Sequence, residues 1–351
     1  MIGRSVRILL VVLVGAFATL LPAGCKSRQE NQAGSGSQTY LFCFWNVENL
    51  FDDHLDGREN RADKEFDTWF AHDAHALRLK LDHLSEALIR LNNGKGPDIL
   101  AVVEVESRRA AELLQEALNS RLPDPSLHYQ HLLMKELAAG RHIAPAILTR
   151  LPVVGDRTRL HGSRLRILEG HIDVHGHDLV VIASHWTARV TDEHGEHRDK
   201  YGDQIHGIFR AMYASNPQVD FLVCGDFNDP PDAPSVTEHL RAIGDLKAVL
   251  QPRGDPLLLD LLADKSAEAG WGTHFYAGRW EIFDQFAISP GLLDHVGWSC
   301  DPESVQTVNT LVQPTDKKRR PWRFGNEHDK HPRGASDHFP VTVQLRVQGS
   351  P

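Results

Sequence analysis

Five short polar clusters follow strand-like apolar runs or lie beside them, and their residue types could do chemistry together. Each cluster combines carboxylates, amides or imidazoles, which are costly to bury unless they are paired or hold a metal ion. Because α/β proteins bind ligands at strand ends, the clusters predict one polar pocket at the rim of a sheet. They are Trp45-Asn46-Val47-Glu48-Asn49, Glu104-Val105-Glu106, Ser184-His185-Trp186, Asp226-Phe227-Asn228 and Asp337-His338, with Asp284 as a sixth candidate within a strand-like run.

The residue types indicate a reaction that uses a divalent metal. Asn, Glu and Asp offer hard oxygen ligands, which suit Mg²⁺ or Mn²⁺ and not a metal that prefers thiolates. Two histidines in the same pocket suit proton transfer and the stabilisation of developing negative charge. The sequence has no Gly-rich phosphate loop and no Gly-x-Ser-x-Gly turn, which argues against covalent acyl chemistry.

The segments that must position these clusters alternate between helix and strand. Leucines at positions 77, 81, 84, 88 and 91 recur at helical spacing and predict a helix over 73–92. Further helices are expected over 108–120 and 201–214. Short apolar runs predict strands over 39–47, 98–103, 219–224, 282–289 and 339–345, and a hairpin over 166–184. This order predicts an α/β protein with mixed sheets covered by helices, in one domain over residues 39–348.

The composition is that of an ordinary globular protein. The 351 residues include 41% hydrophobic and 24% charged residues, and the net charge of −9 does not favour general adhesion to a polyanion. Cys43, Cys224 and Cys300 form no Cys-x-x-Cys pair and give no disulfide framework. Most of the 21 histidines are expected to be surface or core residues, not ligands.

The N-terminus has the pattern of an export signal. Residues 1–24 combine a basic start, an apolar run and small residues, which predicts a secretory signal peptide. Cys25 at the expected cleavage point resembles a bacterial lipoprotein site, although Pro22 departs from that pattern; plain secretion and an uncleaved anchor are the alternatives. Polar residues over 25–38 predict a flexible tether. We therefore expect an exported protein of the cell envelope, held at the membrane through lipidated Cys25.

The ordered clusters resemble the motifs of the endonuclease/exonuclease/phosphatase superfamily, a group of metal-dependent phosphodiesterases. The resemblance extends over about residues 40–345. It implies a four-layer α/β sandwich of two packed mixed β-sheets flanked by helices. The matching segments are Phe44-Trp-Asn-Val-Glu48, Pro97 to Glu104, Ser184-His185-Trp186, Gly225-Asp226-Phe-Asn228 and Ser336-Asp337-His338.

The resemblance implies a metal site for Mg²⁺ or Mn²⁺. Glu104 is expected to bind the ion directly, with Asn46, Glu48 and Asp337 around it. Metal and imidazole charges would together offset the charge of an in-line phosphoryl transition state.

The resemblance also implies catalytic roles. Asp226 is expected to orient or deprotonate the attacking water, and Asn228 to fix that water or a phosphate oxygen. His338 would contact the phosphoryl oxygens, with Asp284 holding its tautomer. His185 would protonate the leaving oxygen or stabilise the pentacovalent state. The alternatives are an ion-pair network at strand ends for Glu104, Asp226 and His338, a packed hairpin residue for His185, and a turn or surface carboxylate for Asp284.

Two residues fit the family pattern loosely. Glu136 is the nearest candidate for the acid that partners the first histidine in DNase-like members, and Arg141 is a candidate phosphate contact. A solvated surface position explains either residue as well as a site role does.

A basic segment leads directly into Asp337-His338. Residues 316–333 contain seven Lys or Arg against three acids, with aromatic residues between them. Arg319, Arg320 and Trp322 could hold a nucleic-acid backbone and stack a base. A mobile charged loop is the alternative.

These observations favour a Mg²⁺-dependent hydrolase of phosphodiester or phosphomonoester bonds, with a nuclease as the preferred activity and nucleic acid as the preferred phosphate-ester substrate. A phospholipid, sphingomyelin or inositol-phosphate hydrolase of the same superfamily is the first alternative. A non-catalytic exported binding protein is the second, and the complete set of motif residues disfavours it.

Overall fold

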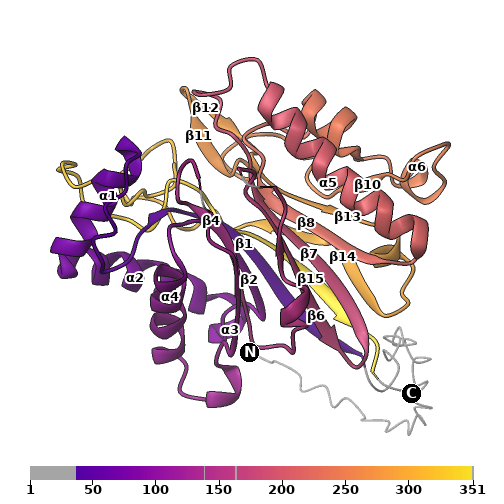
Figure 1. Ribbon diagram of the computed structural model, residues 1–351, viewed down its shortest axis with the longest axis horizontal. Helices are drawn as coiled ribbons and strands as arrows, with labels where there is room; N and C mark the ends of the chain where they lie inside the picture. Colours follow the sequence, from indigo (N-terminus) through magenta and orange to yellow (C-terminus); the bar gives the residue numbers. More distant parts are fainter. Residues whose placement is uncertain (1–36, 138, 163, 350–351) are drawn as a thin grey trace, which may run out of the picture. The chain divides into compact units, whose positions relative to one another are not determined.

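Two mixed β-sheets pack face to face in the computed structural model, which describes residues 37–137, 139–162 and 164–349 (Figure 1). Sheet A contains, in spatial order, β14 (Trp298–Thr307), β15 (Val341–Val347), β1 (Gln38–Leu50), β2 (Ile99–Val105), β4 (Ala144–Thr149) and β3 (His131–Met134). Sheet B contains β5 (Arg159–Leu160), β6 (Ile167–Val174), β7 (His177–His185), β8 (Asp220–Asp226), β13 (Asp284–Ile288), β10 (Leu258–Asp260) and β9 (Ala242–Ile243). A separate hairpin joins β11 (His274–Tyr276) to β12 (Arg279–Glu281).

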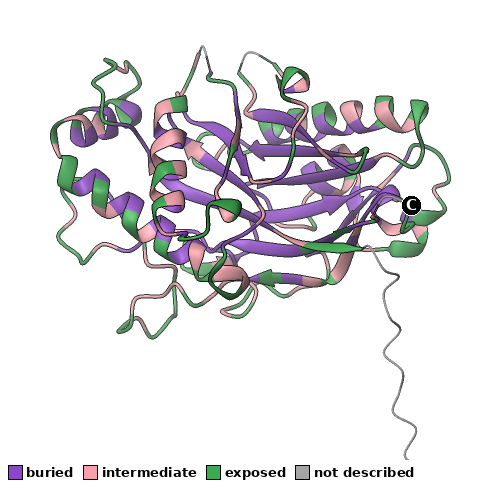
Figure 2. Ribbon diagram, turned by 90° about the horizontal axis from the view of Figure 1, so that it is seen from below, coloured by how far each residue is buried: buried purple, intermediate pink, exposed green. Residues whose placement is uncertain are grey.

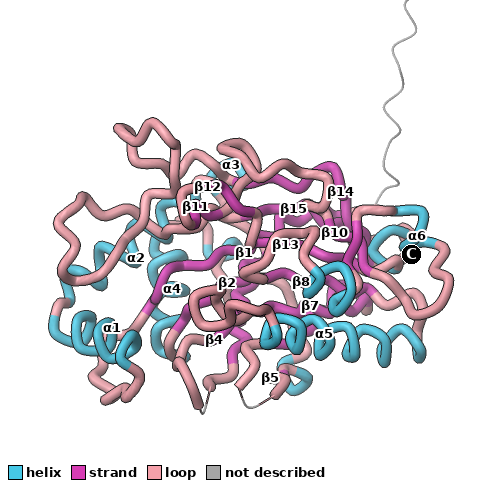
Figure 3. Tube along the Cα trace, turned by 90° about the horizontal axis from the view of Figure 1, so that it is seen from above, coloured by secondary structure: helices cyan, strands magenta, loops and turns pink. Residues whose placement is uncertain are grey.

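Helices cover the outer faces of both sheets, as the views in Figures 1 and 3 show. Helices α1 (Arg61–His72), α2 (Ala74–Ile89) and α4 (Arg108–Ser120) share a hydrophobic cluster with sheet A. Helix α5 (Glu196–Ser215) packs on sheet B. Two short helices, α3 (Leu91–Gly94) and α6 (Leu246–Leu250), and helical turns at Pro125–Leu127, Gly155–Arg157, Ser235–Leu240 and Gly291–Leu293 complete the fold.

The core between the sheets follows the two-residue alternation of a strand. On β1, Phe42 and Phe44 face sheet B, whereas Cys43 and Trp45 face the helices on the other side. Phe42 meets Phe286 of sheet B edge to face, with ring centres 5.5 Å apart. Figure 2 shows the resulting layer of buried strands between more exposed helices and loops. Since both faces of each sheet are covered, the strands appear in the sequence as nearly continuous apolar runs.

The predicted four-layer α/β sandwich is confirmed. Helix α5 begins at residue 196, earlier than the expected 201, because the Asp192 carboxylate accepts the N–H groups of His197 and Arg198 and holds the polar first turn. Strand β14 was not predicted, since it contains Pro302 and several polar residues and shifts register between Asp301 and Gln306.

The N-terminal predictions lie outside the described residues. These are the signal peptide over 1–24, lipidation of Cys25 and the tether over most of 25–38. Within the described part of the chain, no helix combines the length and apolar character that a membrane crossing requires.

Asp260, the last residue of β10, is buried with an incomplete set of hydrogen bonds. One carboxylate oxygen accepts the Leu262 N–H at 2.8 Å, and the other has no partner among the described residues. Burial raises the pKa of Asp260 from 3.8 to about 7. A folded-state pKa above the unfolded value means that the protein loses stability as pH rises between these two values.

We therefore expect Asp260→Asn to stabilise the protein at alkaline pH, because it removes the buried charge. The free energy of unfolding should rise by roughly 1–3 kcal/mol near pH 8 and by less at about pH 5. Urea unfolding at both pH values measures the change, with exposed Asp232→Asn as the matched control. An equal rise in the free energy of unfolding at both pH values would contradict the raised pKa of Asp260.

Candidate active site

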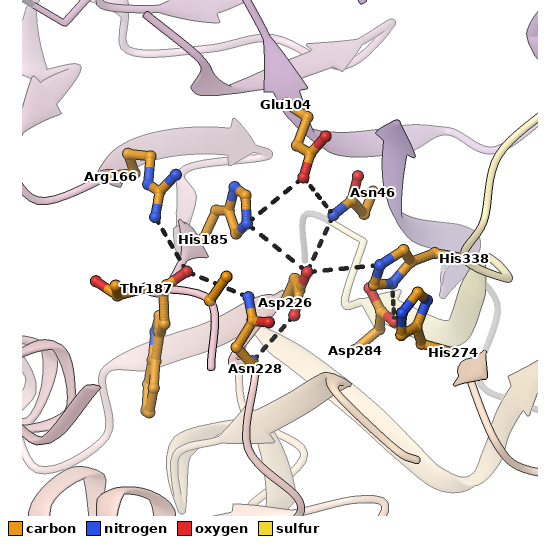
Figure 4. Close-up of polar contacts among 12 residues, drawn as sticks. Asn46, Glu104, Arg166, His185, Thr187, Asp226, Asn228, His274, Asp284 and His338 are labelled. Atoms are coloured by element: carbon orange, nitrogen blue, oxygen red, sulfur yellow. Dashed lines mark hydrogen bonds and ion pairs between the residues drawn. The ribbon is translucent and has the colours of Figure 1, made fainter. Parts of the chain in front are cut away.

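Three chemistry-bearing residues of sheet B lie side by side because strand register places them there. The last residue of β7, His185, pairs with the last residue of β8, Asp226, in the parallel ladder. The first residue of β13, Asp284, pairs with Asp226 in the antiparallel ladder. One end of sheet B therefore presents an imidazole and two carboxylates on adjacent strands (Figure 4).

Sheet A contributes the opposite half of the site. Asn46 lies on β1 and Glu104 on β2, which run parallel, and Asp337-His338 immediately precedes β15. The indole N–H of Trp45 donates to the His338 carbonyl at 2.9 Å, which fixes that segment against β1. The ends of β1, β2 and β15 therefore meet the edge of sheet B.

The Asn46 side-chain amide bridges an acid of each half. Asn46 Nδ2 donates to Glu104 Oε1 at 3.2 Å and to Asp226 Oδ2 at 3.0 Å. Figure 4 shows both bonds, with Glu104 above and Asp226 below the amide. Asp226 Oδ1 accepts the Asn228 N–H at 2.9 Å, and Asn228 Nδ2 donates to the Trp186 carbonyl at 3.2 Å. These bonds orient two acids from different sheets toward a common space.

Four of the eleven left-handed non-glycine residues in the described part of the chain lie at the site. Glu48, Asn49, Glu104 and Asn228 all have positive φ, between 52° and 66°, although none is glycine. Non-glycine residues adopt this left-handed conformation rarely, and each costs of order 1–3 kcal/mol. In each case the left-handed residue belongs to a predicted site motif.

His338 is held as a cation by two acids. Its Nδ1 donates to Asp284 Oδ2 at 2.8 Å, and its Nε2 lies 3.8 Å from Asp226 Oδ2. Burial alone would lower the pKa of His338, but the carboxylates of Asp284 and Asp226 outweigh burial and hold it well above its usual value. Burial, aided by Asp284, raises the pKa of Asp226 to about 7 although charged His338 opposes the shift.

His185, in contrast to His338, is held as a neutral imidazole. Its Nε2 lies 3.7 Å from Glu104 Oε1 and 3.8 Å from Asp226 Oδ2. Burial, reinforced by the charges of Arg166 and Arg141, lowers the pKa of His185 well below its usual value. Two carboxylates beside Nε2 favour the neutral tautomer with its proton on that atom.

The structure does not bring Glu136 to His185. Glu136 is exposed and accepts the Arg108 N–H at the start of α4, at 2.8 Å. His185 Nδ1 is buried and has no hydrogen-bond partner among the described residues. The loose match at Glu136 thus corresponds to a helix cap and not to the acid that partners a histidine.

Arg141 reaches the edge of the site through a neighbour. Its Nη2 donates to Asn49 Oδ1 at 2.6 Å, and the Asn49 N–H donates to Glu104 Oε2 at 2.9 Å. Its Nε donates to the buried carboxylate of Asp63 at 2.7 Å. The guanidinium is therefore fixed near the Glu104 carboxylate.

The Glu48 carboxylate binds groups of the chain itself, where a metal ion was predicted. Its carboxylate accepts the N–H groups of Phe324 and Gly325, at 2.7 Å and 3.1 Å, and pairs with Arg323. Burial and the charge of Asp337 raise the pKa of Glu48 to about 7. Both oxygens are thus used to hold the segment before Asp337, and metal ligation by Glu48 stays a prediction.

The basic segment forms one wall of a cavity beside the site. The cavity has a volume of about 450 Å³, and Arg320 and Trp322 line it together with His274, Arg323 and Asp337. Arg319 is not among the lining residues. Arg320 is also paired with Asp316, at 2.8 Å.

Two site neighbours were not predicted from the sequence. His274 stacks on His338 with ring centres 4.1 Å apart, and its Nδ1 donates to the Asp337 carbonyl at 2.8 Å. Burial, with the charge of His338, lowers the pKa of His274 to about 4.

Lys80 is fully buried, and burial lowers its pKa to about 8 although Glu48 and Asp337 oppose the shift. The sequence did contain a signal for Lys80, because this charged residue lies on the same helix face as Leu77 and Leu84. No sequence pattern pointed to His274.

The carboxylates of Glu104 and Asp337 suit a hard divalent cation. Asn46 turns its NH₂ group toward Glu104 and Asp226, and its Oδ1 accepts the Glu48 N–H at 3.0 Å, so ligation by Asn46 stays a prediction. The Asp337 carboxylate borders the cavity and accepts no hydrogen bond from the residues that the structure describes. Groups of acids and imidazoles close enough to hold an ion include Asp226, Asp284 and His338, and also His274, Asp337 and His338.

Comparison with known proteins agrees with this geometry. The sequence profile of the Endonuclease/Exonuclease/phosphatase family matches residues 156–347, more than half of the chain. No curated protein matches the sequence.

Solved structures share the fold at low sequence identity. Truncated TDP2 from Caenorhabditis elegans has 16% identity and a TM-score of 0.50, with 88% of this chain and 97% of that chain covered. Sphingomyelinase C from Streptomyces griseocarneus has 14% identity and a TM-score of 0.51, covering 88% and 99%. A mannosyl-6-phosphatase from Bacteroides thetaiotaomicron has 13% identity and a TM-score of 0.50, covering 87% and 99%. The profile match and the shared fold lead to one assignment: the chain belongs to the endonuclease/exonuclease/phosphatase family.

Proposed function

We propose that this protein hydrolyses phosphodiester bonds with the help of a bound Mg²⁺ or Mn²⁺ ion, and that its preferred substrate is a nucleic acid. Members of the family hydrolyse phosphoesters. The observation that carries the proposal is the position of the Asp226 carboxylate, 3.8 Å from the Nε2 atoms of both His185 and His338 and bonded to Asn46 beside Glu104.

In the proposed reaction, Asp226 accepts a proton from the attacking water. Its carboxylate is oriented by Asn46 and by the Asn228 N–H. Its pKa of about 7 suits a general base at neutral pH. The water oxygen forms the new bond to phosphorus, and the ester oxygen departs with the bonding electron pair.

The two imidazoles act on the oxygens of the phosphoryl group. Charged His338, supported by Asp284, contacts a non-bridging oxygen and offsets its growing negative charge. Neutral His185 directs its Nε2–H into the same space and can donate a hydrogen bond to the leaving oxygen, which stabilises the charge that develops there while solvent supplies the proton. The divalent ion, held by Glu104 with Asn46 and Asp337, would neutralise further charge on the phosphoryl oxygens.

The preference for nucleic acid is supported by the cavity beside His274 and Asp337. Its wall carries the guanidinium groups of Arg320 and Arg323 and the indole of Trp322. Guanidinium and aromatic groups suit a phosphate backbone and its bases. Phospholipids, sphingomyelin and inositol phosphates remain the alternative substrates. Export and lipid attachment at Cys25 stay predictions that rest on residues 1–25 of the sequence.

A panel of phosphoesters tests the activity. With Mg²⁺ present, we expect cleavage of DNA or RNA, complete loss in EDTA, and a loss of on the order of 10²–10³ in rate for His338→Ala. Sphingomyelin and inositol phosphates complete the panel, and exposed His194→Ala is the matched control. Folded protein that cleaves no phosphoester would refute the proposal; preferential cleavage of a lipid would refute the nucleic-acid preference.

The pH dependence of the rate tests the charge states. We expect kcat/KM to rise with pH through about 7 as Asp226 loses its proton, and to fall at higher pH as His338 loses its own. Because Asp284 helps to keep the proton on His338, Asp284→Asn should move the falling limb to lower pH and lower the His338 pKa measured by NMR. Asp294→Asn, an exposed acid, is the control. An unchanged His338 pKa in Asp284→Asn would contradict the assigned pair.

Arg320→Gln tests the nucleic-acid surface. If the cavity wall contacts a phosphate backbone, the variant should raise KM for single-stranded DNA. It should also reduce the magnitude of the slope of log affinity against log salt by about 1, the change expected for the loss of one phosphate contact. Arg346→Gln removes a similarly exposed guanidinium on β15 and serves as the control. A salt slope identical to that of the natural protein would remove Arg320 from the substrate site.

A further inference from the structure

Arg166 stands beside His185 at the catalytic end of sheet B. The Arg166 carbonyl accepts the His185 N–H at 3.0 Å, one step beyond the pair of Ile167 with Ser184 in the β6–β7 ladder. Residues opposite each other on neighbouring strands project to the same face, with Cβ atoms about 5 Å apart. The two side chains therefore start from the same level of the sheet, and Figure 4 shows Arg166 on the side of His185 away from His338.

The guanidinium of Arg166 is fixed by neutral groups. Its Nη2 donates to the Trp186 carbonyl at 3.0 Å, and its Nε donates to the Tyr201 hydroxyl at 3.4 Å. Tyr201 is buried and stacks on Trp186, with ring centres 6.0 Å apart. The Trp186 carbonyl also accepts the side-chain amide of Asn228 at 3.2 Å. Arg166 and the Asn228 side chain therefore share one acceptor at the rim of the site.

Arg166 differs from four other arginines around the site, each of which has a carboxylate partner. The pairs are Arg141 with Asp63 at 2.7 Å, Arg189 with Asp229 at 2.8 Å, Arg320 with Asp316 at 2.8 Å and Arg323 with Glu48 at 3.0 Å. In the described part of the chain, no carboxylate lies within ion-pair distance of Arg166, and its Nη1 has no hydrogen-bond partner. A planar guanidinium fork matches the oxygens of a phosphate. Arg166 is therefore suited to an anionic group that arrives with the substrate.

We propose that Arg166 binds a second phosphate of the substrate, on the leaving-group side of the scissile phosphate. The inference rests on the proposed function, in which His185 donates a hydrogen bond to the leaving oxygen. Since Arg166 lies beside His185 and away from His338, the departing fragment is the one that reaches it. Its guanidinium donates hydrogen bonds to the oxygens of that second phosphate and offsets their charge. Arg166 thus determines which leaving fragments the site prefers.

A second phosphate separates the candidate substrates. In a nucleic acid, an internal phosphodiester is followed by another phosphate, so the leaving fragment carries the charge that Arg166 lacks. The leaving fragment of sphingomyelin is uncharged and gives Arg166 no partner. Arg320 and Trp322 line the cavity beside His274, which Figure 4 shows on the other side of the site. Groups suited to nucleic acid thus lie on both sides of the reacting phosphate, which favours cleavage at an internal bond.

Dinucleotides with and without a terminal phosphate test the subsite. With Mg²⁺ present, cleavage of the internal bond should favour either pdTpdT or dTpdTp over dTpdT by about ten- to a hundredfold in kcat/KM, mostly through KM. In Arg166→Met this ratio should fall to near one, whereas Arg166→Lys, which keeps the charge, should retain part of it. Because all three substrates are cleaved at the same bond, the ratio cancels any general effect of a variant on folding or on His185.

Binding without hydrolysis supplies a second readout. In EDTA, the NMR signal of the Arg166 Nε–H, identified by its absence from Arg166→Met, should shift when millimolar pdTpdT or dTpdTp is added. The shift should be larger than that caused by dTpdT. Exposed Arg164→Met, two residues away, is the matched control and should keep both the ratio and the shift.

The outcomes separate this inference from the proposed function. Equal cleavage of all three dinucleotides, or a ratio unchanged in Arg166→Met, would overturn the inference and leave phosphoester hydrolysis intact. If the Arg166 signal shifts no more with the phosphorylated dinucleotides than with dTpdT, the inference is overturned whatever the protein cleaves. If the folded protein cleaves no phosphoester but the signal shifts as expected, the proposed function is refuted and Arg166 stands as a phosphate-binding residue.

Discussion

The bond from the Asn46 amide to the Asp226 carboxylate is the contact on which the site depends. It crosses from sheet A to sheet B at the point where the strands end, and the same amide also holds Glu104. The apolar core behind it, with Phe42 against Phe286, sets the separation of the two sheets. Because the core is closely packed, the sheets cannot slide relative to each other without disturbing the alignment of these acids.

The site is built from groups that oppose folding. Buried carboxylates with pKa values near 7 and four left-handed non-glycine residues all lie around the same space. Each is tolerated because the flanking strands of two covered sheets hold it in place. The large core of the sandwich offsets this local instability.

Much of this arrangement could be predicted from the sequence, and the reasons are local. His185 and Asp226 stand where apolar runs end, so that strand pairing alone brings them together at one end of sheet B. Asp284 stands within the predicted strand 282–289, and the family resemblance singled it out as a partner of His338. The alternation of helices and strands predicted mixed sheets covered by helices, and the family resemblance implied their packing as a four-layer sandwich.

The remainder depends on loop packing, which spacing does not encode. The partners of Glu48 come from Phe324 and Gly325, about 275 residues later, in a segment without apolar periodicity. Glu136 stands near the expected motif but folds onto the start of α4. His274 approaches His338 only because a short hairpin folds over the sheet end. These contacts are set by tertiary structure and are visible only once the chain is folded.

The order of strands in sheet A has a consequence for folding. Strand β15 is the last strand in the described sequence, yet it lies inside the sheet, between β14 and β1, and His338 stands just before it. Its pairing with β1 places Gln38 opposite Val347, so this sheet cannot close until two segments about 300 residues apart have met. Because contacts between such distant segments form slowly, His338 reaches the candidate site late in the folding reaction.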